Sequence, residues 1–241
     1  MHQANQEAAK QARQLREAIF WAAGFVAVLW SIKLFEYIAG TNFIGLGILP
    51  GHIKGLWGIL FAPLIHSSWA HLAANSGPML ILGAVLYYGY PRSARIVLPV
   101  IYLLTGAIVW LFARPHYHVG ASGLTFGMLF FITVIGLLRW DKPAIALALA
   151  SFFLYGGMMG GLFPESEGIS YETHIAAAGL GVVLAFVLKN YDPPPPRKIY
   201  SWELEGDEDD GIDWDEFLGD EENDVEDYEE ERRRGPSRYL H

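Results

Sequence analysis

Six apolar stretches, each about long enough to cross a bilayer, constrain the fold of this chain more than any other feature. A membrane-spanning helix needs roughly 20 apolar residues and must satisfy its own backbone hydrogen bonds. The composition agrees, since 52% of the residues are hydrophobic and the mean hydropathy is +0.24. The sequence therefore predicts an all-α membrane protein with spans at about residues 19–39, 66–90, 96–112, 122–138, 144–162 and 170–188.

Residues 40–65 are also apolar, but they contain too many glycines and prolines for one continuous span. We expect an interfacial loop half-buried in the outer leaflet, with Trp57 at the depth of the headgroups. A second glycine-rich run, residues 156–161, predicts that the fifth span is bent or loosely packed.

The charges divide the chain into two regions. Residues 191–241 hold 19 acidic and 6 basic side chains, whereas residues 1–190 hold 7 acidic and 11 basic ones. We expect an N-terminal cytoplasmic juxtamembrane segment (1–18), a six-helix domain (19–190) and a Pro-rich, acidic, disordered cytoplasmic tail (191–241). The acidic run repels phosphate and argues against nucleic-acid binding. Its aromatic residues leave two interpretations open, a solvated tail or a docking motif for a cytoplasmic partner.

The distribution of Lys and Arg predicts the orientation of the spans. With a cytoplasmic N-terminus, ten basic residues fall in inner segments and only Lys54 and Arg114 in outer loops. We therefore expect a multi-pass protein of the cell membrane with both termini cytoplasmic. The second, fourth and sixth spans then run inward from the extracytoplasmic face.

Each of these three spans opens with polar residues, which are costly in lipid and commonly functional. They are His66, His71 and Asn75 in the second span, Ser122 in Gly120-Ala121-Ser122-Gly123 at the start of the fourth, and His174 in the sixth. At about 1.5 Å of rise per residue, all lie at a similar depth below the outer face. The sequence predicts one pocket that opens to the extracytoplasmic side.

Ser122 and His174 are the candidate catalytic residues, because a neutral imidazole can take the hydroxyl proton and later give it to a leaving amine. No carboxylate is expected at that depth, since Glu172 lies two residues from His174 and should face elsewhere on the helix. We expect a Ser-His dyad whose imidazole is oriented by packing. Phe126, one turn below Ser122, is placed to stack on that ring.

His71 and Asn75 share a helix face through their i, i+4 spacing. Together with the backbone N–H of Ser122, they are candidate donors to the oxyanion of a tetrahedral intermediate. His66 lies five residues before His71 and should point elsewhere, which favours anchoring of a loop over catalysis.

Small residues line the faces that carry the candidate dyad. Gly123 and Gly127 are four residues apart in the fourth span, as are Ala177 and Gly181 in the sixth. Such pairs allow membrane helices to approach closely. We expect this packing to bring Ser122 to His174.

These motifs resemble those of the rhomboid family of intramembrane serine proteases over residues 40–188. The resemblance rests on His66-x4-His71-x3-Asn75, on Gly120-x-Ser122-Gly123 with Phe126-Gly127, and on His174 followed by small residues. It implies the six-transmembrane-helix rhomboid fold and cleavage of substrate transmembrane segments near the outer face. It also implies a gate formed by the fifth span and the loop before the sixth.

The chain departs from the family pattern in two places. Ala177 stands where many members have glycine, and the Trp-Arg pair of the first loop is absent, with Leu56-Trp57-Gly58 nearby. Neither departure removes a catalytic group, so loop-based assembly roles are not carried over but the protease assignment is kept.

The leading hypothesis is a serine endopeptidase that hydrolyses peptide bonds in or near transmembrane segments of single-pass or multi-pass membrane proteins in the lipid bilayer. A catalytically silent rhomboid-like binder or chaperone of membrane helices would predict loss of Ser122 or His174, and both are present. A transporter with histidine proton relays would predict mid-membrane charges on the motif spans, which have none. No cofactor or metal is expected, and the absence of cysteine excludes disulfides and thiolate zinc sites.

Overall fold

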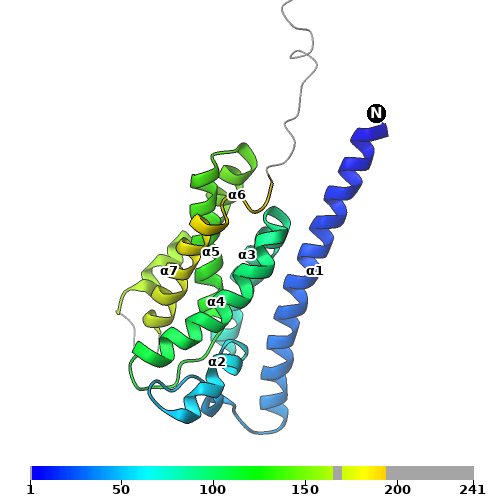
Figure 1. The fold of residues 1–241 in the computed structure, drawn as a ribbon. Helices are drawn as coiled ribbons and strands as arrows, with labels where there is room; N and C mark the ends of the chain where they lie inside the picture. The colour runs from blue at the N-terminus through cyan, green and yellow to red at the C-terminus, as the bar shows by residue number, and fades with distance from the viewer. Residues whose placement is uncertain (1, 165–169, 194–241) are drawn as a thin grey trace, which may run out of the picture. The chain divides into compact units, whose positions relative to one another are not determined.

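The computed structural model describes residues 2–164 and 170–193, and helices dominate both ranges (Figure 1). The α-helices are α1 (His2–Ile38), α2 (Gly58–Phe61), α3 (Trp69–Gly89), α4 (Pro91–Phe112), α5 (Ser122–Arg139), α6 (Lys142–Tyr155) and α7 (Tyr171–Leu188). The 3-10 helices are η1 (Ile44–Leu46), η2 (Ile53–Trp57), η3 (Ala62–Leu64) and η4 (Gly156–Leu162).

Within the described residues, six helices are long and apolar enough to cross a membrane. They are α1 from Ala8, α3, α4, α5, α6 together with η4, and α7. The predicted all-α fold with six transmembrane helices is therefore confirmed, and this is a multi-pass membrane protein. The proposed division at residues 18 and 190 stays a prediction, and the tail from residue 194 lies outside the described residues.

Several predicted boundaries were wrong by a few residues for identifiable reasons. Helix α1 runs without a break from His2 to Ile38, and its candidate membrane span begins at Ala8 and not at residue 19. Helix α4 starts at Pro91 and not at residue 96, because the fixed φ of proline suits a first helical turn and Arg92 and Arg95 hid that turn from a hydropathy argument. The glycine run after α6 continues as the 3-10 helix η4, as a bent fifth span requires.

Helix α5 is the central element of the bundle. Over its 18 residues, 61% are buried inside the protein, whereas 11 to 39% are buried in stretches of the same length in the other candidate spans. Helices α3, α4, α6 and α7 all pack against α5, and α1 packs against α3. The start of α5, which carries Ser122, is thereby held on several sides.

The contact between α5 and α7 depends on glycine. A Cβ atom built on Gly181 would lie 2.3 Å from the carbonyl oxygen of Gly127, so the two backbones meet directly. One turn or more nearer the site, Gly123 lies against Thr173 and Ala177. The predicted close packing is present, with one change: the Cα of Gly127 faces Ile101 of α4, and only its carbonyl faces α7.

The segment between α1 and α3 is a set of short helices, as the glycine and proline pattern predicted. It packs on α4, where Ile59 lies over Gly106 and the hydroxyl of Tyr102 donates to the carbonyl of Leu60. Within it, Gly55 and Gly58 lie against the backbone of residues 47–49, where any side chain would collide. This compact segment forms one wall of the site described below.

Asp192 closes the opposite end of the bundle. It is 3% exposed, and its carboxylate accepts hydrogen bonds from the backbone N–H groups of Arg92 and Ser93 at 2.8 and 2.9 Å. A carboxylate there satisfies donors that the first turn of α4 cannot bond internally. Arg139, at the end of α5, donates to the carbonyl of Asp192 at 3.1 Å. The interactions of the folded domain therefore extend past residue 190.

Replacing Gly181 with alanine should push α7 away from α5. We expect Gly181→Ala to lower stability by about 1–3 kcal/mol, the usual cost of overpacking. The matched control is Gly179→Ala on the same helix, where nothing lies within 4 Å of an added Cβ. Thermal unfolding of both variants in detergent measures the difference, and equal melting temperatures would contradict the close contact.

Candidate active site

Ser122 follows a turn whose backbone is held by the segment of short helices between α1 and α3. Ile48 and His118 form an antiparallel bridge, and the N–H of Gly120 donates to the carbonyl of Ala62 at 2.9 Å. Gly120 has φ +117°, a conformation that side chains rarely adopt. An added Cβ there would also lie 2.6 Å from the imidazole of His71. Glycine is therefore required at position 120 for both reasons.

Ser122 and His174 lie within hydrogen-bond distance. The Oγ of Ser122 and Nε2 of His174 are 2.9 Å apart, and the other ring nitrogen, Nδ1, is 2.8 Å from the carbonyl oxygen of Gly161. A carbonyl oxygen can only accept, so Nδ1 carries the proton in a neutral ring. The lone pair of Nε2 then faces the Ser122 hydroxyl, which is the arrangement that a general base needs.

The imidazole of His174 is oriented by a hydrogen bond as well as by packing. Phe126 stacks on it as predicted, with ring centroids 4.0 Å apart and an interplanar angle of 7°. The hydrogen bond to Gly161 was not predicted, because the carbonyl comes from η4 and leaves no mark in the side-chain sequence. A side chain at Gly161 would crowd both rings, since its Cβ would lie 3.0 Å from Nδ1 and 3.1 Å from Phe126.

A cavity of about 830 Å³ adjoins the pair, and Ser122, His174, His71 and Asn75 all line it. The amide of Asn75 donates one N–H to the carbonyl of His71 at 3.0 Å, and Nδ1 of His71 lies 3.1 Å from the hydroxyl of Ser67. The structure thus brings together the residues that the sequence singled out. The role of His71 and Asn75 toward an oxyanion stays a prediction.

His66 lies closer to the site than its spacing from His71 suggested. Its Nε2 accepts a hydrogen bond from the N–H of Ala121 at 3.3 Å, and its ring meets that of His71 edge-on at 5.1 Å. The expectation that it anchors a loop therefore gains a definite partner, the residue before Ser122. The expectation that it points away from His71 was wrong, because the chain around residues 66–68 is not helical.

A buried ion pair holds His66 in turn. The ammonium of Lys33 donates to the carboxylate of Glu36 and to the carbonyl of His66, both at 2.9 Å. Glu36 is 2% exposed and also accepts from the N–H of Phe43 at 2.6 Å. The predicted Lys33–Glu36 pair is therefore present, and it joins α1 to the loop that supports the serine.

A second set of polar contacts ties the loop before Ser122 to the start of α7. The guanidinium of Arg114 pairs with Glu172, with Nε to Oε1 at 2.5 Å and Nη2 to Oε2 at 3.2 Å. Nδ1 of His118 lies 2.5 Å from the hydroxyl of Ser170, which caps α7, and Nε2 of His118 lies 3.0 Å from the carbonyl of Arg114. Burial lowers the pKa of His118, so the ring is neutral at pH 7.

Sequence reasoning missed this contact set. Glu172 was expected only to face away from the dyad, and Arg114 was used only for orientation. One signal was available: the polar run 114–118 stands directly before the glycine-flanked serine. Its partner on α7 could not be chosen without the fold.

Comparisons with known proteins agree with this architecture. A family model described as "Rhomboid domain" matches residues 54–191. Uncharacterized proteins of Mycobacterium tuberculosis and Mycobacterium bovis are each 37% identical over 186 residues, which covers 72% of this chain and 75% of the relative. An uncharacterized protein of Mycobacterium leprae is 32% identical over 186 residues, covering 72% and 71%. The chain belongs to the rhomboid family, as its motifs indicated.

The support that His66 gives to Ala121 should depend on pH. Burial, followed by the neighbouring charges of His71 and Lys33, lowers the pKa of His66 from 6.5 to about 4. Between pH 6.5 and about 4, His66 is therefore protonated in the unfolded chain but neutral in the folded chain. The contribution of His66 to the free energy of unfolding is fully present above pH 6.5. It falls by up to about 3 kcal/mol as the pH drops toward 4.

His66→Gln should flatten this pH dependence, because an amide can accept from Ala121 without titrating. The measurement is thermal unfolding in detergent at a series of pH values from 7.5 to about 4. The His52→Gln variant, altered at an exposed histidine, serves as the control. Parallel curves for wild type and His66→Gln would contradict the assignment.

Proposed function

We propose that this protein is a serine-type intramembrane endopeptidase that hydrolyses peptide bonds in or near transmembrane segments of membrane proteins. The observation that carries the proposal is the position of His174 between Gly161 and Ser122. Its ring donates to a carbonyl on one side and offers a lone pair to a hydroxyl on the other. A histidine with only a packing role has no need of this arrangement.

In the proposed reaction the Oγ of Ser122 attacks the scissile carbonyl carbon as Nε2 of His174 takes the hydroxyl proton. The resulting imidazolium keeps its Nδ1–H on Gly161 and then gives the Nε2 proton to the leaving amine. The backbone N–H of Ser122, with His71 and Asn75, would donate to the oxyanion. Water, activated by the same histidine, would release the acyl group from Ser122.

The substrate class follows from the surroundings of the cavity. The pair lies at the first turns of helices that belong to candidate membrane spans. A peptide bond in an intact helix hides its carbonyl in a hydrogen bond, so substrates with glycine or other helix-weakening residues near the cut should be preferred. The charge distribution supports an opening to the extracytoplasmic side with both termini in the cytoplasm.

Ser122→Ala and His174→Ala should each abolish cleavage of a labelled transmembrane substrate, because the nucleophile and its base act as one unit. Ser122→Ala should also abolish labelling by a fluorophosphonate probe. Ser31→Ala is the matched control, since that hydroxyl on α1 only bonds the carbonyl of Ala27.

The same experiment separates the two hypotheses. Cleavage that persists in both dyad variants would refute the dyad. A wild-type protein that neither reacts with the probe nor cleaves, but retains a membrane helix through purification, would instead support the catalytically silent binder.

Asn75→Ala should slow turnover without preventing folding. Loss of one oxyanion donor typically costs about 3–4 kcal/mol of barrier, roughly a hundredfold or more in kcat. KM should change little, because the contact strengthens only in the transition state. Steady-state kinetics with a transmembrane substrate test this, and a change confined to KM would assign Asn75 to substrate binding.

A further inference from the structure

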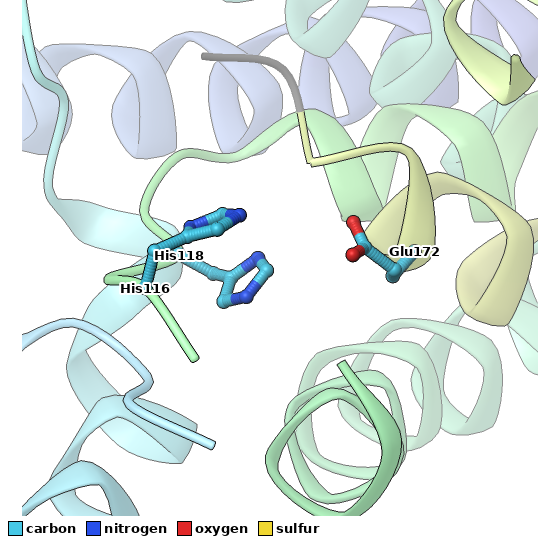
Figure 2. Close-up of side chains that lie close together, drawn as sticks. All are labelled: His116, His118 and Glu172. Carbon is cyan, nitrogen blue, oxygen red and sulfur yellow. The ribbon is translucent and has the colours of Figure 1, made fainter. Parts of the chain in front are cut away.

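Three potential metal ligands converge beside the candidate active site (Figure 2). His116 and His118 precede the serine turn, and their rings stack with centroids 3.9 Å apart and an interplanar angle of 27°. Figure 2 shows the carboxylate of Glu172, from the first turn of α7, facing the two imidazoles. One ligand atom from each residue lies within 4.8 Å of the others.

The cluster is accessible from one side. His116 is exposed, Glu172 is partly buried and His118 is buried, so an ion can approach through His116. Both histidines and Arg114 also line the cavity that contains Ser122 and His174. The two histidines of the cluster therefore border the same cavity as the candidate dyad, and the cluster shares no residue with the dyad.

The present partners of these groups set the cost of binding an ion. Glu172 is paired with Arg114 through two guanidinium nitrogens, and the two side chains are 15% and 50% exposed. His118 bonds the hydroxyl of Ser170 and the carbonyl of Arg114. A bound ion must therefore displace Arg114 from Glu172 and one of the two partners of His118. Tetrahedral zinc holds nitrogen and oxygen ligands at about 2.0–2.1 Å, which places ligand atoms roughly 3.4 Å apart. Ligand atoms that lie up to 4.8 Å apart must therefore close to about 3.4 Å, and the stacked His116 ring must turn so that its in-plane lone pair meets that of His118. His116 is exposed, which leaves room for this movement.

We propose that His116, His118 and Glu172 form a binding site for a divalent ion of the zinc class. Two imidazoles and one carboxylate are the donor types that zinc accepts, and the open approach leaves room for water as a fourth ligand. The site goes beyond the sequence analysis, which expected no metal. In binding, the ion replaces the guanidinium of Arg114 as the positive partner of Glu172.

A consequence follows that rests on the proposed protease function. Ser122 lies four residues after His118, and His174 lies two residues after Glu172. An ion bound by this cluster cross-links the two segments that carry the dyad and lies at the border of the cavity that contains it. Zinc therefore acts as a reversible inhibitor that hinders entry of a substrate helix.

The test of the site is direct metal binding to the purified full chain in detergent. Zn²⁺ is titrated against a chromophoric chelator, and Co²⁺ is followed by its visible absorption, which reports tetrahedral coordination. We expect one tight site per chain, weakened at least tenfold in His116→Ala and in Glu172→Gln. His52→Ala, altered at an exposed histidine outside the cluster, should bind as the wild type does.

The Arg114→Gln variant distinguishes a metal site from a cluster that has only a structural role. Removing the guanidinium frees Glu172 for the ion, so Zn²⁺ should bind several-fold more tightly. Tight binding that is unchanged in His116→Ala places the ion elsewhere, for example on the acidic segment, and overturns the proposal. Absence of a tight site, or weaker binding in Arg114→Gln, overturns it as well.

The inhibitory consequence is tested separately, with each variant compared with its own metal-free rate. Zn²⁺ should slow cleavage of a transmembrane substrate by wild type at concentrations that fill the site, and should not slow His116→Ala in that range. Metal binding without any metal-free cleavage would refute the protease function and leave the site standing. Cleavage that is equally sensitive to Zn²⁺ in His116→Ala would refute the inhibitory role.

Discussion

The contact on which the rest of this structure depends is the direct approach of two backbones, that of α5 at Gly127 and that of α7 at Gly181. Lipid provides no hydrophobic drive for helices to associate, so close van der Waals packing must provide it. In this chain the packing also sets chemistry. Because α5 begins with Ser122 and α7 carries His174 in its first turn, the spacing of the two helices fixes the distance between hydroxyl and imidazole.

Backbone carbonyl groups then orient His174 and the turn that precedes Ser122. The carbonyl of Gly161 selects which nitrogen of His174 carries the proton, and the carbonyl of Ala62 holds the N–H of Gly120. A Cβ at position 120 would collide with the imidazole of His71, and one at position 161 would crowd that of His174. The site is therefore built from a few polar side chains placed against bare backbone, which explains why glycine surrounds it.

Much of this arrangement could be predicted from sequence because the membrane reduces the choices. The length of the apolar stretches predicts the spans, and polar residues at the starts of three spans can meet at one common depth. The sequence alone therefore predicts that Ser122, His174 and Phe126 lie in one cluster. The direction that the Lys and Arg distribution indicates stays a prediction. The small-residue faces of α5 and α7 were predicted in the same way.

What could not be predicted depends on backbone atoms or on pairing between distant loops. The Gly161 carbonyl has no side-chain signature, and the contact of His66 with Ala121 requires knowing that residues 66–68 are not helical. The pairing of Arg114 with Glu172 joins positions 58 residues apart, and Glu165 and Glu167 stand shortly before Glu172 in the sequence as other candidate partners. Asp192 was assigned to the tail by composition, although its carboxylate belongs to the start of α4.

That last contact has a consequence for how the chain can be divided. Asp192 accepts from two N–H groups at the start of α4. Farther along the same helix, Tyr102 and Gly106 contact Leu60 and Ile59 of the segment that forms one wall of the site. A truncation made just before residue 192 would therefore remove a helix cap as well as a tail. A shortened chain that keeps this cap must extend at least through that aspartate.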